Sequence, residues 1–261
     1  MAEIAKSSSI ASHDELDTFR LPPTQGTVSK MEFVDKRTIT SNPNSNPLEF
    51  TIPESGQNFI DLYNSRLEIK LRLKNGEADL AATDKVGPIN ILLQSLFSQV
   101  DIFMNNTRVT DAGTNYSYKA YIPIMLSYGT EVKETWLTSQ LFSKDEIVMD
   151  ATSGTGNKGF NDRSEYTKNS QIVHLIGPLY SDIWQIQKWI APGITLKISL
   201  WRNNNRFVLM TTEKNKKYRI EITEAKLVVN YVGLQQQAYL AYEAALSLSP
   251  AKYPLDRKSV V

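Results

Sequence analysis

The sequence predicts an all-β protein, an antiparallel jelly-roll β-sandwich with short inserted helices and a C-terminal helix. The first observation is that residues 66–74 alternate apolar and charged side chains at every position, which gives a strand one buried and one solvated face. Such strands are typical of antiparallel sheets, because parallel strands are covered on both faces. The second observation is that many short strand patterns recur along the chain, with only short helical patterns between them, which favours a jelly roll.

Further runs have strand character and extend the predicted sandwich. They cover residues 28–39, 47–53, 99–104, 107–109, 171–180, 193–201 and 218–232. Residues 41–47 contain only Ser, Asn and Pro, so they predict a loop, and Asn105-Asn106 tolerates the positive φ of a tight hairpin. Residues 203–205 are three asparagines that we expect to turn the chain, so that residues 207–210 pair back onto the preceding strand.

The last long strand pattern contains an irregularity. Apolar residues occupy even positions up to Ile222 and odd positions from Ala225 onward. A slip of one residue in the alternation is what a β-bulge produces. The sequence therefore predicts a bulge at Thr223-Glu224.

Two helical patterns are predicted between the strands. Pro88 is expected to begin a short helix, because its missing N–H costs nothing at the first helical position. Apolar residues then recur with helical spacing as far as Phe97. Residues 115–128 are aromatic-rich and predict a partly helical segment that Pro123 bends or breaks.

The remaining segments complete the predicted organisation. Residues 152–163 are rich in Gly and Asn and predict a long exposed loop, whereas residues 235–248 are rich in Ala and predict a helix. The chain of 261 residues is then divided into a flexible arm (1–24), a jelly-roll domain (25–234) and a helical linker (235–250).

Composition excludes several classes of function. The formal net charge of +1 gives no support to a strongly basic nucleic-acid-binding protein. The absence of cysteine excludes disulfides, thiolate metal sites and a cysteine nucleophile. The N-terminus lacks the apolar core of a signal peptide, and no apolar run is long enough to span a membrane. We therefore expect a soluble intracellular protein that is not secreted, and the glycosylation sequons at Asn105 and Asn115 to be coincidental.

Residues with catalytic potential are few. The chain has two histidines, His13 in the polar arm and His174 within a strand pattern, and neither has metal-ligand spacing or a paired base. We expect His174 to be structural. The glycine-rich stretch that precedes Lys158 lacks the residue order of a phosphate-binding loop. The acidic residues near it are expected to form a solvated face; they are Asp145, Glu146 and Asp150. The sequence thus predicts a protein that is not an enzyme, with no catalytic, cofactor-binding or metal site.

The basic cluster and the tryptophans each allow a structural and a functional interpretation. One basic cluster is either a charged turn between strands or a nucleic-acid contact; it comprises Lys214, Lys216, Lys217 and Arg219. Other basic residues are too dispersed for a packaging arm, namely Arg20, Lys30, Lys36 and Arg37. The tryptophans either fill cores and interfaces or stack on bases or sugars; they are Trp136, Trp184, Trp189 and Trp201. The structural interpretation is favoured for both groups.

Four blocks carry a resemblance to a known family. They are ELDTFRLPPTQ (15–25), PLEFTIPESGQNFIDL (47–62), DLAATDKVGPINILLQSLFSQVDIFMNN (79–106) and ALSLSPAKYPL (245–255). Together they closely resemble the major capsid protein of Polinton (Maverick) elements and the related adintoviruses. The resemblance extends from about Glu15 to Leu255, and the third block is its most specific part.

The resemblance implies a double jelly-roll capsid protein that forms trimers, which tile an icosahedral shell. This chain would then be the first jelly roll, and residues 251–261 would be the start of a second, truncated one. The implied partners are other copies, a minor or penton capsid protein and, non-specifically, packaged DNA. The implied location is the virion, which would assemble in the host nucleus or cytoplasm. The resemblance also allows the chain to be an endogenous genomic copy of such a viral protein. The alternatives are a single jelly-roll penton or minor capsid protein, and a sugar- or ligand-binding jelly roll that uses Trp136, Trp184 or Trp189 as a stacking platform.

Overall fold

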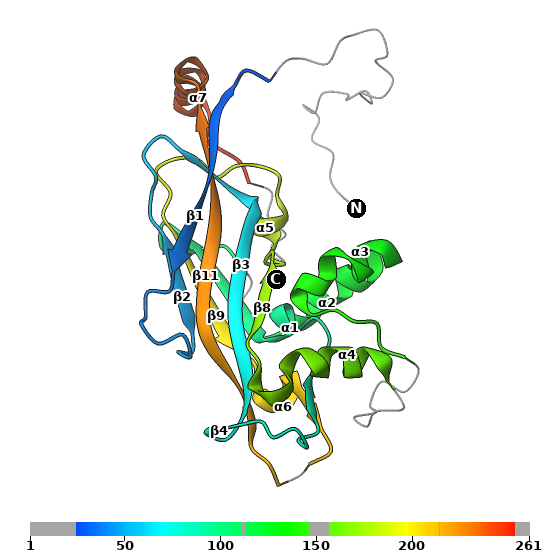
Figure 1. The fold of residues 1–261 in the computed structure, drawn as a ribbon. Helices are drawn as coiled ribbons and strands as arrows, with labels where there is room; N and C mark the ends of the chain where they lie inside the picture. The colour runs from blue at the N-terminus through cyan, green and yellow to red at the C-terminus, as the bar shows by residue number, and fades with distance from the viewer. Residues whose placement is uncertain (1–24, 111–112, 147–156, 214, 254–261) are drawn as a thin grey trace, which may run out of the picture.

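The computed structural model describes residues 25–110, 113–146, 157–213 and 215–253 (Figure 1). Its strands are β1 (Val28–Arg37), β2 (Leu48–Ile52), β3 (Phe59–Asn75), β4 (Ala78–Asp79), β5 (Val86–Pro88), β6 (Phe97–Met104), β7 (Thr107–Arg108), β8 (Val173–Gly177), β9 (Leu196–Arg202), β10 (Leu209–Thr211) and β11 (Tyr218–Leu234). Its helices are α1 (Leu92–Ser95), α2 (Tyr116–Ser127), α3 (Thr130–Glu134), α4 (Lys158–Thr167), α5 (Asp182–Gln185), α6 (Asn205–Val208) and α7 (Gln236–Leu248), with 3-10 turns η2 (Trp136–Gln140) and η3 (Lys168–Ser170).

Strand pairing defines the fold. One sheet has the order β1-β11-β3-β4, with β8 also paired to β3, and the second has the order β2-β9-β6-β7. When the short strands β4, β5 and β10 are set aside, the other described strands pair from the outside inward. The first pairs with the last (β1 with β11), then β2 with β9, β3 with β8 and β6 with β7, all antiparallel. This nested pairing is a long hairpin rolled into two sheets, so the predicted jelly roll is confirmed.

The core lies between the two sheets and follows the predicted alternation. In β3, Leu67, Ile69, Leu71 and Leu73 are buried. The second sheet faces them with buried side chains at every other position of β2 and β9, namely Leu48, Phe50, Ile52, Leu196, Ile198 and Leu200. Because the period of a strand is two, the same alternation places charged residues on the opposite face.

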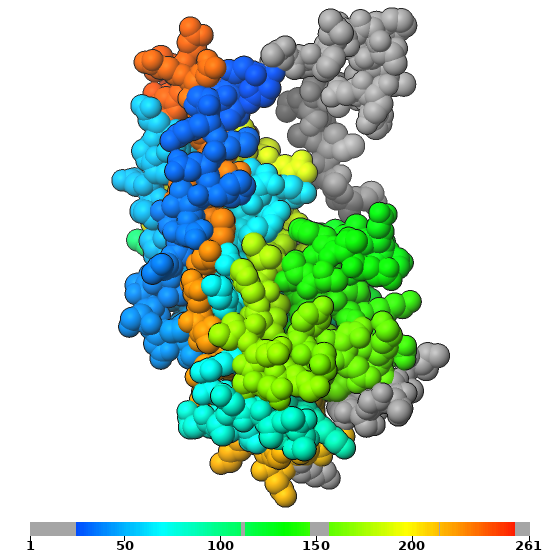
Figure 2. All heavy atoms as spheres, viewed as in Figure 1, coloured from blue at the N-terminus to red at the C-terminus, as the bar shows by residue number. Residues whose placement is uncertain are grey.

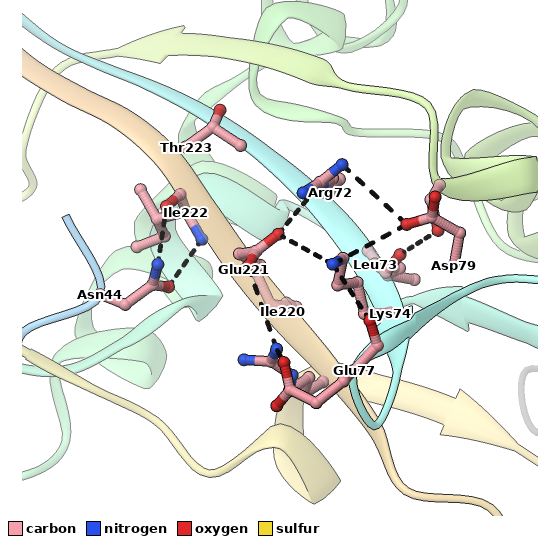
Figure 3. A network of polar contacts seen from close by, with 12 residues as sticks. Asn44, Arg72, Leu73, Lys74, Glu77, Asp79, Ile220, Glu221, Ile222 and Thr223 are labelled. Carbon is pink, nitrogen blue, oxygen red and sulfur yellow. Dashed lines mark hydrogen bonds and ion pairs between the residues drawn. The ribbon is translucent and has the colours of Figure 1, made fainter. Parts of the chain in front are cut away.

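The outer face of β3 and β11 carries cross-strand ion pairs (Figure 3). Arg72 Nε lies 2.6 Å from Glu221 Oε2, and Lys74 Nζ lies 3.8 Å from the same oxygen. The hydrogen bond from Arg72 and the surrounding positive charges lower the pKa of Glu221. Asp79 of β4 extends this network at 3.9 Å from both cations. Ion pairs at a protein surface each contribute about 0–1 kcal/mol, and these are partly exposed, so they keep the face polar more than they hold the fold.

Strand β11 contains the predicted bulge. The register with β3 shifts between Ile222 and Glu224, which leaves Thr223 as the extra residue. Beyond it, the buried positions change from even to odd numbers, as the sequence indicated. A second irregularity between Val228 and Asn230, which the sequence did not indicate, accommodates extra residues of β3.

The segment around Pro88 differs from its prediction. Pro88 ends the strand β5 and does not begin a helix, and α1 comprises only residues 92–95. Helix α1 cannot extend further toward the N-terminus, because Ile91, which precedes it, has a φ of 52°, in the left-handed region. All four residues of α1 are buried, so the apolar spacing reflects a segment covered on every side. Strand β10 pairs with β5, not with the preceding strand β9 as expected.

Two further predictions about helices are corrected. Helix α2 continues through Pro123 without a break. Helix α4 occupies much of the predicted loop 152–163, because the side chain of Asn157 caps it by accepting a hydrogen bond from Phe160 N. Residues 152–156 of that predicted loop, the predicted arm 1–24 and residues 254–261 lie outside the described residues.

Helices α1 to α4 and helix α7 lie at two different places (Figures 1 and 2). Helices α1 to α4 form a lobe beside β8, and this lobe is the green region next to the sheet in Figure 2. Helix α7 stands at one end of the sandwich, next to the start of β1, and confirms the predicted C-terminal helix. No residue of α7 is buried.

Candidate assembly surface

Helix α2 is anchored by one of its faces. Its buried residues are Tyr116, Ser117, Ala120 and Ile124, whose spacing places them along one side of a helix. Tyr116 Oη donates a hydrogen bond to Gln94 Oε1 (2.6 Å) and accepts one from Tyr180 N (3.1 Å). Burial raises the pKa of Tyr116, so the hydroxyl remains protonated and can make both bonds. The helix is therefore fixed to α1 and to the start of α5.

The other face of α2 is apolar and open to solvent. We call it the α2 ridge; it comprises Tyr118, Tyr121, Ile122, Met125 and Leu126. Leu126 is 81% exposed and Ile122 is 54% exposed. The only charged residue in the helix sequence is Lys119. Contiguous exposed apolar side chains on a surface helix mark an interaction site more often than chance exposure does.

Polar contacts border the ridge. Lys119 Nζ lies 2.7 Å from Asp182 Oδ1, and Lys133 Nζ donates to the main-chain oxygen of Met125 at 2.8 Å. At one end, the ring of Tyr118 packs edge-on against Phe207, with centroids 6.0 Å apart. An apolar centre with a polar border is the usual anatomy of a protein–protein interface.

A buried ion pair connects helix α4 of the helical lobe to neighbouring segments. Arg163 of α4 is 1% exposed, and its Nη2 lies 2.8 Å from Asp145 Oδ1. Its other nitrogens donate to the main-chain oxygens of Pro88 (3.1 Å) and Ser143 (2.8 Å). The pair thus ties α4 to β5 and to the segment after η2. Asp145 was expected on a solvated face, and this expectation is wrong because the carboxylate is the partner of a buried guanidinium.

The histidine within the described residues, His174, is paired with an acidic side chain of the neighbouring strand, which is consistent with the expected structural role. His174 Nε2 lies 2.7 Å from Glu68 Oε1, and Lys226 Nζ lies 3.0 Å from Glu68 Oε2. The imidazole is on the outer face of the sheet and its side chain is 51% exposed. His13 and Asp150 lie outside the described residues.

The described end of the glycine-rich stretch around Lys158 is helical. Lys158 and Gly159 open α4. A Cβ at Gly159 would lie 2.3 Å from the main-chain oxygen of Lys144, so glycine is needed here for close packing. Residues 154–156 lie outside the described residues.

The basic cluster before β11 is a charged turn in its described part. Lys216 Nζ contacts Asp84 and lies 3.1 Å from Glu213 Oε1. Arg219 Nη2 lies 2.8 Å from Glu77 Oε2. These pairs favour the structural alternative for this cluster.

Each of the four tryptophans contacts a different part of the protein. Trp184 is fully buried and donates from Nε1 to the main-chain oxygen of Ser65 at 3.2 Å, so it cannot be a stacking platform. Trp201 Nε1 donates to Asp101 Oδ2 at 3.1 Å. The other two pack against neighbouring side chains, Trp136 beneath the guanidinium of Arg66 and Trp189 against Phe59.

Metal-ligand clusters and membrane-spanning helices are both absent from the described residues. No group of three or more His, Asp or Glu side chains there is arranged to hold a metal ion. Among the helices of this same part of the chain, none combines the length and the apolar character needed to cross a membrane.

Comparisons with known proteins place the fold. No protein-family model matches the chain. A curated Caenorhabditis elegans protein, "Uncharacterized protein F54H12.2", is 24% identical over 161 residues, which cover 61% of this chain and 36% of that protein.

Three solved viral structures share the arrangement of the chain. The Faustovirus major capsid protein has a TM-score of 0.55 at 13% identity, over 88% of this chain and 58% of that one. PBCV-1 VP54, fitted into a reconstruction of the virophage Sputnik, has a TM-score of 0.51 at 11% identity, over 86% and 47%. The Sputnik virophage structure has a TM-score of 0.50 at 14% identity, over 90% and 55%.

These likenesses define the class of fold. The chain is a jelly-roll protein with the architecture found in viral major capsid proteins. It spans about a third of the curated relative and about half of each solved structure.

Sequence reasoning missed the α2 ridge. The residues 115–128 were identified as aromatic-rich and partly helical, yet not as a surface. The available signal was the helix sequence itself, which is apolar around most of its circumference and has Lys119 as its one charged residue. A helix of this composition needs cover on more than one side, either from its own chain or from a partner.

Proposed function

We propose that the protein is a structural subunit of a viral shell, a major capsid protein that assembles with further copies of itself. The observation that carries this proposal is the jelly-roll fold, for which 86–90% of the chain superposes on proteins of viral capsids. A jelly roll alone does not fix function, so the α2 ridge matters as a second support. It supplies an apolar surface that a neighbouring copy would cover.

The finer identity follows from the resemblance of the four sequence blocks. We infer a double jelly-roll major capsid protein of the Polinton or adintovirus type, in a virus or as an endogenous genomic copy, with trimeric capsomers in an icosahedral shell. Coverage of about half of each solved viral structure is consistent with one jelly roll of two. In this proposal, residues 25–234 are the first jelly roll, residues 235–250 are the linker, and residues 251–261 begin the second. The exposed helix α7 suits a linker, because none of its residues belongs to the core.

The proposed partners follow from the same role. They are other copies of the chain, a minor or penton capsid protein and, non-specifically, packaged DNA, and the proposed location is the virion. A single jelly-roll minor capsid protein is the alternative within this class. A sugar-binding module is less well supported, because Trp184 is buried and the other tryptophans have separate neighbours.

Electron microscopy of the purified chain tests the proposal. We expect concentrated protein to form regular particles or arrays of repeating subunits in negative stain. A uniform population of single chains under every salt and pH condition that keeps the protein folded would contradict it. Trimeric units would support the major capsid protein, whereas pentameric units would support the minor one.

A further inference from the structure

A polar hollow lies where β9 ends and α6 begins, and no residue of the α2 ridge lines it. Its volume is about 430 Å³, and we call it the asparagine hollow. Its described lining consists of two arginines (Arg202 and Arg219), five asparagines and Ile220. No described residue that lines it is acidic. The lining is therefore rich in hydrogen-bond donors and positive charge.

Arg202 lacks a counter-ion within the described part of the chain. Its Nη1 donates to Asn44 Oδ1 at 3.3 Å and its Nη2 to the main-chain oxygen of Ile220 at 2.7 Å, and both acceptors are neutral. Burial lowers the pKa of Arg202, and the positive charge of Arg219 lowers it further. A largely buried charge without a partner of opposite sign is costly, so proteins normally supply one. Arg163, by contrast, has Asp145 as its partner.

Three of the five asparagines present donors; Asn203 differs, because its Nδ2 already donates to Ser95 O (2.9 Å) and Ser117 Oγ (3.0 Å). The side-chain oxygens of Asn46, Asn204 and Asn205 each accept a hydrogen bond from a main-chain N–H, at 2.9, 3.0 and 3.2 Å respectively. These bonds fix which end of each amide points into the protein. The three NH₂ groups have no hydrogen-bond acceptor among the described residues, and each can donate two bonds. They are free to bind a ligand.

Neighbouring residues hold this arrangement in place. Asn44 is clamped to β11, since its Nδ2 donates to the oxygen of Ile222 and its Oδ1 accepts from the nitrogen of the same residue (Figure 3). Arg219 Nη2 lies 2.8 Å from Glu77 Oε2 and 3.9 Å from Glu221 Oε1, and neither carboxylate lines the hollow. Glu77 is 91% exposed and forms a weak pair, whereas Glu221 also pairs with Arg72. Neither is a counter-ion of Arg202.

We propose that the asparagine hollow binds a small oxyanion of the phosphate class, with the guanidinium of Arg202 as the charged ligand and the asparagine amides as neutral donors. A guanidinium presents a planar fork of N–H groups that matches two oxygens of a phosphate. The anion would supply the counter-charge that Arg202 lacks. The site concerns the single chain, so its existence does not depend on shell assembly.

Isothermal titration of the full chain with inorganic phosphate, against chloride at equal ionic strength, tests the proposal. We expect saturable binding that the Arg202→Gln variant weakens at least about tenfold, because a charge-assisted bond is lost. The matched control is Arg206→Gln, which removes an exposed arginine of α6 that does not line the hollow. We expect that control to bind as the unmodified chain does.

A second variant keeps the test decisive if Arg202→Gln is misfolded by circular dichroism. Asn204→Asp retains the oxygen that caps α6 but replaces the NH₂ donor with a negative charge, so we expect no phosphate binding and an unchanged fold. Absence of saturable binding to the unmodified chain would overturn the proposal. So would equal weakening by Arg202→Gln and Arg206→Gln, because it would indicate general electrostatic attraction.

A competition experiment identifies the source of the phosphate group. A short single-stranded oligodeoxynucleotide that displaces inorganic phosphate would support the proposal and assign the site to phosphodiesters. An oligodeoxynucleotide that leaves phosphate bound would support it and assign the site to free phosphate. Neither outcome bears on whether copies of the chain assemble, so the failure of this proposal and the failure of the proposed function can be told apart.

Discussion

Arg163 Nη2 lies 2.8 Å from Asp145 Oδ1, and the guanidinium is 1% exposed, so this pair is a buried contact between α4 and the segment after η2. Replacing Arg163 with Met would leave the carboxylate of Asp145 without its positive partner and would remove one donor from each of two main-chain oxygens, those of Pro88 and Ser143. We expect the free energy of unfolding to fall by about 3–5 kcal/mol, measured by urea denaturation.

The matched control for this prediction is Lys158→Met on the same helix. Lys158 Nζ lies 3.4 Å from Asp162 Oδ2 and its side chain is 76% exposed, so we expect a change below about 0.5 kcal/mol. Similar losses in the two variants would refute the view that the buried pair fastens the helical lobe.

Tyr116→Phe tests the hydrogen bonds that anchor α2. The variant removes an acceptor for Tyr180 N and a donor to Gln94 Oε1 in a buried site. We expect a loss of about 1–3 kcal/mol in thermal or urea unfolding, because buried polar groups are left unpaired. Tyr118→Phe is the control, since its ring lies on the exposed α2 ridge and its loss of a hydroxyl should change stability little. An unchanged stability in Tyr116→Phe would show that these bonds do not anchor the helix.

The titration of Glu213, in the turn before β11, is expected to account for part of the loss of folding stability at low pH. A hydrogen bond from Tyr218 Oη (2.5 Å) and one from Lys85 N (2.8 Å), with the Lys216 ammonium nearby, lower the pKa of Glu213 to about 2. A carboxyl with a depressed folded-state pKa contributes stability that is complete above its unfolded value, about 4.5, and that is lost as the pH falls toward 2.

The Glu213→Gln variant removes that titration. We expect its urea midpoint to fall less steeply than that of the unmodified chain between pH 4.5 and 2, and to be lower at pH 7, where the ionised carboxylate is present. Parallel pH profiles for the two proteins would contradict this assignment. The comparison isolates Glu213 because the lowered pKa values of Asp84, Glu221 and Glu224 are common to both proteins.

Deleting Thr223 tests the bulge in β11. Without the extra residue, the odd-numbered apolar side chains from Ala225 onward would turn to the opposite face, because a slip of one residue reverses every side chain of a strand. We expect the deletion to prevent folding, seen as loss of cooperative unfolding. Thr223→Ala keeps the residue and loses only the hydrogen bond to the Lys70 oxygen, so we expect a cost of about 1 kcal/mol or less. A stable, cooperatively folded deletion variant would contradict the assigned register.

The strands were predictable because their signal is local. In residues 66–74 the alternation of side chains alone determines which face is buried, and the change of phase near Thr223 reveals a bulge without knowledge of the partner strand. The prediction for the segment around Pro88 was wrong because it, too, used only the local pattern. Its helical spacing is real, but the segment is covered on all sides, and burial all round cannot be distinguished from one apolar stripe by spacing alone.

Features that depend on distant segments were not predictable. The pairing of β10 with β5 joins residues far apart in sequence, and nothing in residues 207–210 indicates that partner. The asparagines of residues 41–47 and 203–205 were identified correctly as turn formers, yet their convergence on Arg202 follows only from the folded chain. Helix α4 was missed although Asn157 and Phe160 have the spacing of an N-cap pair, because glycines dominated the interpretation of that stretch.

The central claim is that copies of the chain associate through the α2 ridge, and sedimentation velocity over a range of concentrations tests it most directly. We predict that the unmodified chain forms oligomers as its concentration rises, and that the double variant Ile122→Glu/Leu126→Glu remains a folded monomer, because charges there would be buried without partners. The control Leu248→Glu, at an 89% exposed position of α7 outside the ridge, should associate like the unmodified chain. A chain that stays monomeric at every concentration, or a double variant that associates as strongly as the control, would contradict the claim.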